Sequence, residues 1–166
     1  DAALKFLEEA ANEIPGSQLI LSNLTRNLVQ NAHRLRADPG AKDDEAQEFA
    51  AKALDYAKEL IQVFPSPESY RQLAEANWLN GDVPAAIKLI EQVRECGYFP
   101  LHLRRLLAQL YVDENKVPSA IGTFVSAIED YPNDWRLKND TAALWGQYGD
   151  PDRAIELLEP VKDEGV

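Results

Sequence analysis

The most constraining feature of this sequence is a turn that recurs twice at an interval of 34 residues. The turn at Gly81 is followed at this interval by Asn115 and then by Gly149. The alanines and isoleucines after each turn keep the same spacing: Ala86, Ala120 and Ala154, and Ile87, Ile121 and Ile155. A period of this length is typical of stacked helical repeats, in which each repeat is one supersecondary unit. We therefore predict an array of stacked helical units.

Helix signals fill the segments between the turns. Apolar residues at steps of three and four, interrupted by Pro15 and by Pro39, predict long helices in the first third of the chain. From Ser66 onward the helices become shorter and regular, with Ser66 as an N-cap and Pro67 in the first helical position. The expected helices are 2–13, 17–36, 44–64, 67–80, 83–96, 101–114, 117–130, 134–148 and 151–163.

Small residues recur where paired helices are expected to cross. Helices that pack about 8–10 Å apart need small side chains at the crossing point. Alanines occupy such positions in the first helices (Ala74, Ala108, Ala142) and in the second helices (Ala86, Ala120, Ala154). The spacing therefore indicates close helix pairs, with larger apolar residues packed beside each crossing.

The repeated unit resembles the tetratricopeptide repeat family. The middle unit carries the family pattern of apolar, small and aromatic residues with a closing proline: Leu107, Ala108, Tyr111, Ala120, Phe124, Ala127 and Pro132. The other units depart from it at Asn77, where the family has an aromatic, at Tyr98, where it has proline, and at Thr141, where it has leucine. The resemblance implies an all-α fold: a right-handed α-solenoid of stacked antiparallel helix pairs.

The resemblance also predicts how the chain is divided. One solenoid domain is expected, beginning with a half repeat that supplies a second helix only and continuing with an atypical repeat of long helices. Three regular repeats of the 34-residue type then follow. The predicted bounds are 1–166 for the domain, 1–15 for the half repeat, 16–65 for the atypical repeat, and 66–99, 100–133 and 134–166 for the regular repeats. Because the chain contains no methionine, we expect it to be a fragment of a longer array.

Charge and composition narrow the class of partner. The formal net charge is -11, which argues against nucleic acid and anionic membrane surfaces, since both require a basic footprint. No stretch approaches the roughly 20 apolar residues that span a bilayer, so no direct membrane insertion is expected. The single cysteine leaves the compartment open between cytoplasm and bacterial periplasm.

The sequence offers little for catalysis or for a cofactor. His33 and His102 fall on different helices, and both are predicted to be ordinary surface or interface residues. Cys96 is predicted to be a buried or half-buried thiol. There is no metal-ligand spacing of His or Cys and no glycine-rich phosphate loop. We therefore predict no catalytic residues, no metal site and no cofactor.

Partner-binding residues are expected on the first helices, because the resemblance implies a concave groove lined by them. The predicted groove residues are Glu68, Arg71, Glu75 and Trp78, then His102, Arg105 and Gln109, then Arg136 and Asn139. Two interpretations of the arginines stay open: they bind carboxylates of a partner, or they pair with the chain's own Glu68, Glu75 and Asp113. Trp78 is either an aromatic anchor for the partner or a packing residue between repeats.

The resemblance implies a non-catalytic scaffold for protein–protein interaction that binds a peptide or partner segment in this groove. An alternative is a structural spacer or self-assembling segment of a bacterial envelope or export machine, of the polysaccharide-secretion kind. The open N-terminal half repeat motivates the alternative, because an uncapped array end exposes apolar surface. Self-association through that end is its expected consequence.

Overall fold

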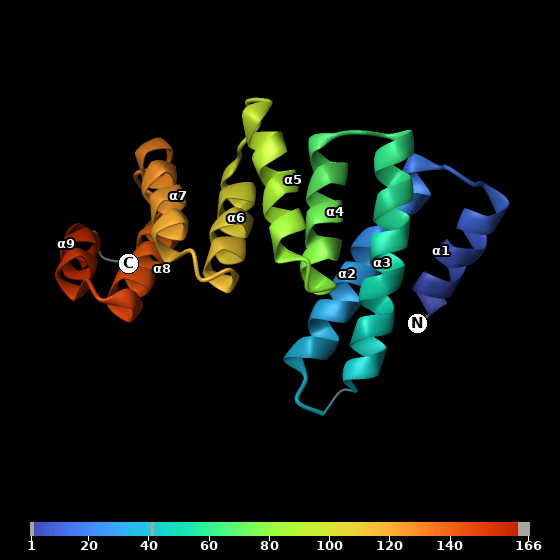
Figure 1. Cartoon of the computed structure of the whole chain (residues 1–166), viewed down its shortest axis with the longest axis horizontal. Helices are drawn as coiled ribbons and strands as arrows, with labels where there is room; N and C mark the ends of the chain where they lie inside the picture. The colour runs from blue at the N-terminus through green and yellow to red at the C-terminus, as the bar shows by residue number, and fades with distance from the viewer. Residues whose placement is uncertain (1, 41, 163–166) are drawn as a thin grey trace. The chain divides into compact units, whose positions relative to one another are not determined.

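The computed structural model describes residues 2–40 and 42–162, so the ends of the predicted domain, residue 1 and residues 163–166, lie outside the described residues. All regular secondary structure in the described part is helical (Figure 1). The helices are α1 (Ala2–Glu13), α2 (Gln18–Ala37), α3 (Asp43–Val63), α4 (Pro67–Leu79), α5 (Val83–Glu95), α6 (Leu101–Asp113), α7 (Val117–Asp130), α8 (Trp135–Tyr148) and α9 (Pro151–Lys162). These bounds agree with the expected helices to within one residue at each end, and the all-α class is confirmed.

Side-chain caps fix the starts of α4 and α5. The Ser66 hydroxyl accepts a hydrogen bond from the Ser69 backbone N–H at 3.2 Å, and the Ser66 N–H donates to the Ser69 hydroxyl at 2.8 Å. Pro67 occupies the first turn, where its missing N–H costs nothing. The Ala85 N–H donates to a carboxylate oxygen of Asp82 at 3.1 Å. The predicted cap at Ser66 is therefore confirmed.

The three recurrent turns adopt left-handed backbone angles. The φ angle is +84° at Gly81, +55° at Asn115 and +108° at Gly149. Glycine adopts this conformation without a steric penalty from a Cβ atom, and asparagine tolerates it better than most residues. The left-handed requirement explains why the 34-residue period is marked by these residue types.

Alanine substitutions at two nearby glycines should change stability in opposite directions. A Cβ atom would meet nothing within 4 Å at either Gly149 or Gly146, so the backbone alone decides the effect. Gly149→Ala should destabilise the protein by about 1–2 kcal/mol, because its φ is positive. Gly146→Ala, within α8, should stabilise it by about 0.5–1 kcal/mol. Urea unfolding followed by circular dichroism measures both changes, and two effects of the same sign would contradict this account.

The first of these turns is also anchored to the preceding helices. The Asn80 side-chain amide donates to the Ala50 carbonyl of α3 at 2.7 Å, and the Gln47 amide donates to the Asn80 side-chain oxygen at 3.2 Å. The Arg36 guanidinium, at the end of α2, donates to the Leu79 carbonyl. Hydrogen bonds from two earlier helices therefore hold the turn that sets the repeat phase.

The chain divides into two compact units: unit 1, Asp1–Tyr98, contains α1 to α5, and unit 2, Phe99–Val166, contains α6 to α9. In unit 1, α2 and α3 form a long antiparallel pair, α1 packs against α2, and α4 packs against both α2 and α3 (Figure 1). Four alanines at steps of three and four on α3 are at most 2% exposed: Ala46, Ala50, Ala53 and Ala57. Their small side chains let α2 approach α3 closely, as larger residues could not.

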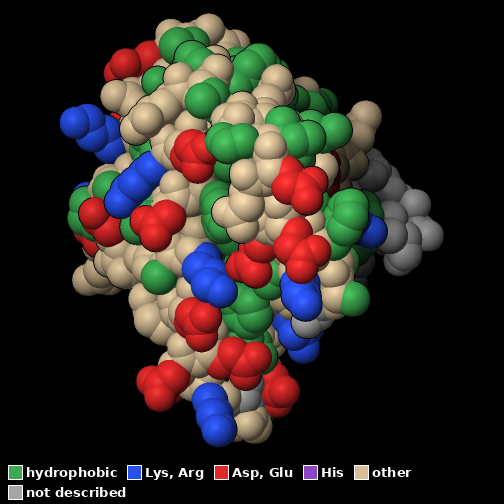
Figure 2. Space-filling model, turned by 90° about the vertical axis from the view of Figure 1, so that its right-hand side faces the viewer, with side chains coloured by type: hydrophobic (Ala, Val, Ile, Leu, Met, Phe, Trp, Pro, Cys, Tyr) green, Lys and Arg blue, Asp and Glu red, His purple; other side chains and the backbone are tan. Residues whose placement is uncertain are grey.

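Unit 1 carries several exposed apolar side chains. Phe6 on α1 is 69% exposed and Leu19 on α2 is 72% exposed. Ile14, Val63 and Phe64 are also exposed. Figure 2 shows hydrophobic side chains toward the top of the N-terminal face and mixed acidic and basic ones below. Self-association through this end stays a prediction.

Unit 2 repeats the helix-pair arrangement on a smaller scale. Here α6 packs against α7, α7 against α8, and α8 against α9. Its core joins Ala108 of α6, Leu137 of α8 and a stripe on α7 made of Ala120, Phe124 and Ala127. Ala108 and Ala120 are fully buried, which agrees with their predicted place at a helix crossing.

The prediction for Cys96 is wrong, because its thiol is exposed. The buried stripe of α5 runs through Ala86, Ile90 and Val93, and Cys96 follows the last residue of the helix. Gly97, at a φ of +80°, then turns the chain away. Cys96 therefore lies beyond the last inward position of α5.

Candidate functional site

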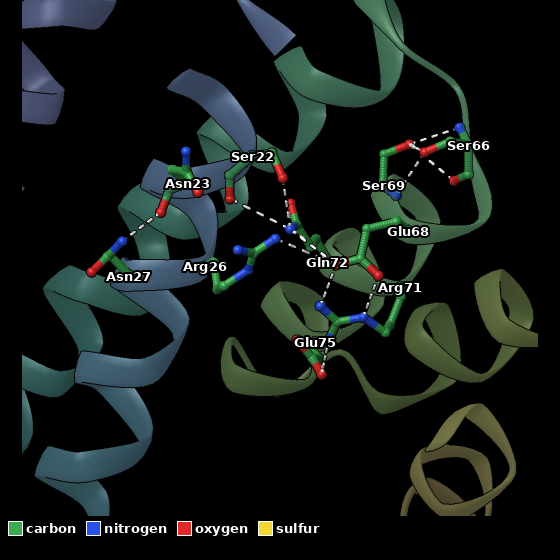
Figure 3. Close-up of polar contacts among 10 residues, drawn as sticks. All are labelled: Ser22, Asn23, Arg26, Asn27, Ser66, Glu68, Ser69, Arg71, Gln72 and Glu75. Atoms are coloured by element: carbon green, nitrogen blue, oxygen red, sulfur yellow. Dashed lines mark hydrogen bonds and ion pairs between the residues drawn. The ribbon is translucent and has the colours of Figure 1, made fainter. Parts of the chain in front are cut away.

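The candidate site in unit 1 is built on α2 and α4, which lie side by side (Figure 3). Gln72 of α4 is 1% exposed, and its amide nitrogen donates to the Ser22 hydroxyl of α2 at 3.1 Å. The same nitrogen lies 3.3 Å from a carboxylate oxygen of Glu68. This buried amide fixes the position of α4 on α2 and orients the charged residues beside it.

Arg71 is held by two carboxylates of its own helix. Its Nε and Nη2 atoms donate to the two oxygens of Glu68 at 2.9 and 2.6 Å, and its Nη1 atom donates to Glu75. These contacts, the hydrogen bonds to Glu68 first, raise the pKa of Arg71. The hydrogen bonds from Arg71 in turn lower the pKa of Glu68 against the opposing effect of burial. Three predicted groove residues thus form one charged cluster.

A residue of α2 extends this cluster. Nη2 of Arg26 lies 3.9 Å from a carboxylate oxygen of Glu68, so α2 and α4 each bring a guanidinium to the same carboxylate (Figure 3). Sequence reasoning missed Arg26, because the long first repeat does not follow the 34-residue phase. The sequence shows Arg26 only as a basic residue within the helix predicted over 17–36.

Trp78, at the other end of the α4 face, packs against His33 of α2. The ring centroids are 5.4 Å apart in an edge-to-face arrangement. Desolvation by neighbouring atoms lowers the pKa of His33; the nearby Arg36 also lowers it, whereas Glu75 opposes the shift. His33 was predicted to be an ordinary surface or interface residue, and it is an exposed residue at the contact between α2 and α4. Trp78 therefore makes a packing contact within unit 1.

His33 gives unit 1 a predictable response to acid. Its pKa is below the ordinary value of 6.5 in the folded protein, so the unfolded chain binds more protons in this range. Stability should therefore fall as the pH drops through about 6.5, and the His33→Gln variant should lose less. Urea unfolding at about pH 7.5 and pH 5 measures the difference. Glu68, whose pKa lies below 4.5, titrates outside this window. An equal loss in both proteins would contradict the prediction.

The predicted residues of unit 2 lie on α6 and α8. Arg105 of α6 lies near two carboxylates, with Nη2 3.6 Å from an oxygen of Asp134 and Nε 3.7 Å from an oxygen of Asp140. The Gln109 amide donates to Asp113 at 2.9 Å, so Asp113, predicted as an arginine partner, contacts Gln109 instead. Ion pairs from α6 to the start and the body of α8 thus bring the two first helices together.

The other predicted residues of unit 2 are more exposed. The Arg136 guanidinium carbon lies 5.5 Å from the centroid of the Trp135 ring, within cation–π range. His102 and Asn139 are exposed on α6 and α8. The predicted set therefore forms a charged cluster in unit 1 and a second group of polar side chains in unit 2.

The described part of the chain offers neither a cluster of metal ligands nor a membrane span. Across residues 2–40 and 42–162, no group of three or more His, Cys, Asp or Glu side chains is placed to hold a metal ion. Within the described helices, none is both long and apolar enough to cross a bilayer.

Comparison with known proteins identifies the repeat. Residues 40–97 match the family model of the tetratricopeptide repeat. No match was found among curated protein sequences. Proteins with this repeat generally mediate protein–protein interactions as non-catalytic scaffolds.

Solved structures show the same fold at low sequence identity. MamA from Desulfovibrio magneticus RS-1 has a TM-score of 0.75 and 13% identity, with 98% of this chain and 83% of MamA covered. YrrB, described as a tetratricopeptide-repeat protein with an unusual peptide-binding site, has a TM-score of 0.65 and 14% identity, with 96% and 74% covered. A thermophilic tetratricopeptide-repeat protein of Thermus thermophilus has a TM-score of 0.55 and 22% identity, with 87% and 89% covered. Residues 40–97 therefore carry a tetratricopeptide repeat, and the chain shares the fold of tetratricopeptide-repeat proteins.

Proposed function

We propose that the chain is an interaction scaffold that binds a peptide or partner segment along the first helices of its repeats. The observation that carries the proposal is the cluster in which Arg26 of α2 and Arg71 of α4 share the carboxylate of Glu68. Charged side chains from two neighbouring first helices thus converge on one face, where an extended segment would cross both helices. The peptide-binding site described for YrrB supports this choice of ligand.

The proposed binding residues fall into two sets. In unit 1 they are Glu68, Arg71, Glu75 and Trp78, to which the contacts of α2 add Arg26 and His33. In unit 2 they are His102, Arg105, Gln109, Arg136 and Asn139. Polar side chains at these positions are suited to orient a partner's backbone and charged groups, while Trp78 and Trp135 offer aromatic surface.

Footprinting of a selected peptide tests the proposal. A peptide that binds the whole chain is first selected from a random displayed library. Photo-cross-linking groups are then placed on first helices, at Glu68 and Gln109, or on second helices of the same units, at Lys88 and Glu129. All four positions are exposed. We expect cross-links from the first helices. Cross-links from the second helices alone, or failure to select any peptide, would contradict the proposal.

The alternative, a spacer in an envelope or export machine, is not favoured by the structural similarities. Those similarities are to proteins that share the fold, and one of them is described by its peptide-binding site. The interaction scaffold is therefore the function that we propose.

A further inference from the structure

We infer that the partner segment is basic: it carries lysine or arginine side chains, and the carboxylates around the groove arginines bind them. This inference rests on the proposed function and adds the charge of the partner. It departs from the simplest expectation for arginines in a groove, which is that they capture acidic groups.

In unit 1, the arginine is already occupied. All three guanidinium nitrogens of Arg71 donate to Glu68 or Glu75, and the Arg71 side chain is only 18% exposed. A partner's carboxylate would have to displace one of these residues and leave a half-buried carboxylate without its cation. The Glu68 side chain, by contrast, is 48% exposed. A segment that approaches this cluster therefore meets the carboxylate of Glu68 more readily than the guanidinium of Arg71.

In unit 2, Arg105 lies in ion-pair range of two carboxylates, although its Nε and Nη2 atoms form no hydrogen bond. Arg105 faces both Asp134 and Asp140, at 3.6 and 3.7 Å, and Asp140 is more exposed than Arg105, at 45% against 36%. Each of the two in-phase arginines therefore has two carboxylates of the chain itself in ion-pair range. An ionised carboxylate offers about four lone-pair sites, so it can hold an arginine and still accept a hydrogen bond from a partner's cation.

The net charge of the whole chain also favours a basic partner. In unit 1, Arg26 and Arg71 balance Glu68 and Glu75, so this face offers no net positive charge to attract an acidic segment. The net charge of -11 repels acidic segments and steers basic ones toward the surface. Charge complementarity of this kind mainly sets specificity and the association rate, and salt screens it.

Two synthetic peptides test the inference. They are fluorescein-labelled, share a leucine- and alanine-rich sequence, and differ only in four positions that are lysine in one and glutamate in the other. Fluorescence polarisation with the whole chain at low salt should show that the lysine peptide binds at least about tenfold more tightly. The preference should shrink as salt is added.

A double variant separates the specific carboxylates from bulk charge. Glu68→Gln with Asp140→Asn should weaken binding of the lysine peptide about threefold to tenfold, since each exposed ion pair contributes about 0.2–1 kcal/mol. It should also strengthen binding of the glutamate peptide, because Arg71 and Arg105 each lose a carboxylate. The matched control, Glu59→Gln with Glu129→Gln, removes the same charge from exposed positions on α3 and α7 and should change either affinity less than about twofold.

Three results of the peptide titrations would overturn the inference. They are tighter binding of the glutamate peptide, binding of neither peptide, and equal losses in the double variant and its control when circular dichroism shows both variants folded. If acidic peptides selected from the displayed library cross-link to the first helices, the partner is not basic, but the proposed binding along the first helices still holds. If basic peptides cross-link only to the second helices, the proposed binding along the first helices is wrong.

Discussion

Replacing Leu28 by alanine should lower the free energy of unfolding by about 2–5 kcal/mol. Leu28 is fully buried at the centre of α2, in the unit 1 core that also contains Leu24 of α2 and Ala53 of α3. The substitution removes buried apolar atoms and leaves a cavity, because the two long packed helices cannot collapse fully onto the missing side chain. Urea unfolding monitored by far-ultraviolet circular dichroism measures the loss.

The same substitution at Leu19 provides a control on the same helix. Leu19 is 72% exposed, so Leu19→Ala should change the free energy of unfolding by no more than about 0.5 kcal/mol. Both variants delete the same atoms, and only the burial differs. Similar losses from Leu19→Ala and Leu28→Ala would contradict the packing of α2 against α3 described above.

The helices and their pairing could be predicted because the signals are local. Apolar periodicity located α2 and α3, and Ser66, Pro67 and Gly149 marked helix ends by the backbone geometry that each favours. Where packing rather than periodicity determines whether a side chain is buried, the prediction was less accurate. Cys96 was predicted to be a buried or half-buried thiol because free cysteine is usually buried, yet it is exposed and lies one residue beyond the end of α5.

The candidate site could be predicted only in part, because side-chain partners depend on which helices become neighbours. The repeat phase placed Arg71 beside Glu68 and Glu75, which lie one turn away on the same helix. The 34-residue period does not extend to α2, so Arg26 and His33 were not predicted to lie beside the α4 residues. Contacts between helices were also missed, because the 34-residue period gives positions along the chain and does not determine which side chains of neighbouring helices meet.

Unit 2 shows this limit at Arg105. Asp113, on its own helix α6, was the expected partner, whereas Asp134 and Asp140 lie at the start and in the body of α8. The sequence distance to Asp134 is 29 residues, so only the packing of α8 beside α6 brings them into range. The balance of charges around Arg71 and Arg105, from which the sign of the partner's charge is proposed, therefore follows from the structure and not from the repeat pattern.

Arg104→Ala should destabilise unit 2 by about 2–4 kcal/mol, a large effect for an arginine outside the apolar core. Arg104 is 12% exposed and joins the start of α6 to the end of α7. Its Nε atom donates to the Phe99 carbonyl at 2.9 Å, Nη1 donates to the Ser126 carbonyl at 3.1 Å, and Nη2 donates to Asp130. The guanidinium also lies 5.3 Å from the ring centroid of Phe99 and 5.8 Å from that of Tyr131.

The Arg104→Lys variant separates the contribution of the positive charge to stability from that of the hydrogen-bond geometry. Arg104→Lys keeps the cation but not the planar fork that reaches two carbonyls and a carboxylate, so it should still lose about 1–2 kcal/mol.

Arg153→Ala is the matched control: this arginine is 65% exposed and pairs with Asp150 within one turn, so its loss should cost less than about 1 kcal/mol. In a Trp78→Phe background, urea unfolding followed by tryptophan fluorescence reports on unit 2 through Trp135 and Trp145. If Arg104→Lys were as stable as the wild type, charge alone would account for the contact. If Arg153→Ala and Arg104→Ala cost the same, Arg104 would be no more than a surface ion pair, and the junction of α6 and α7 would depend on its apolar core alone.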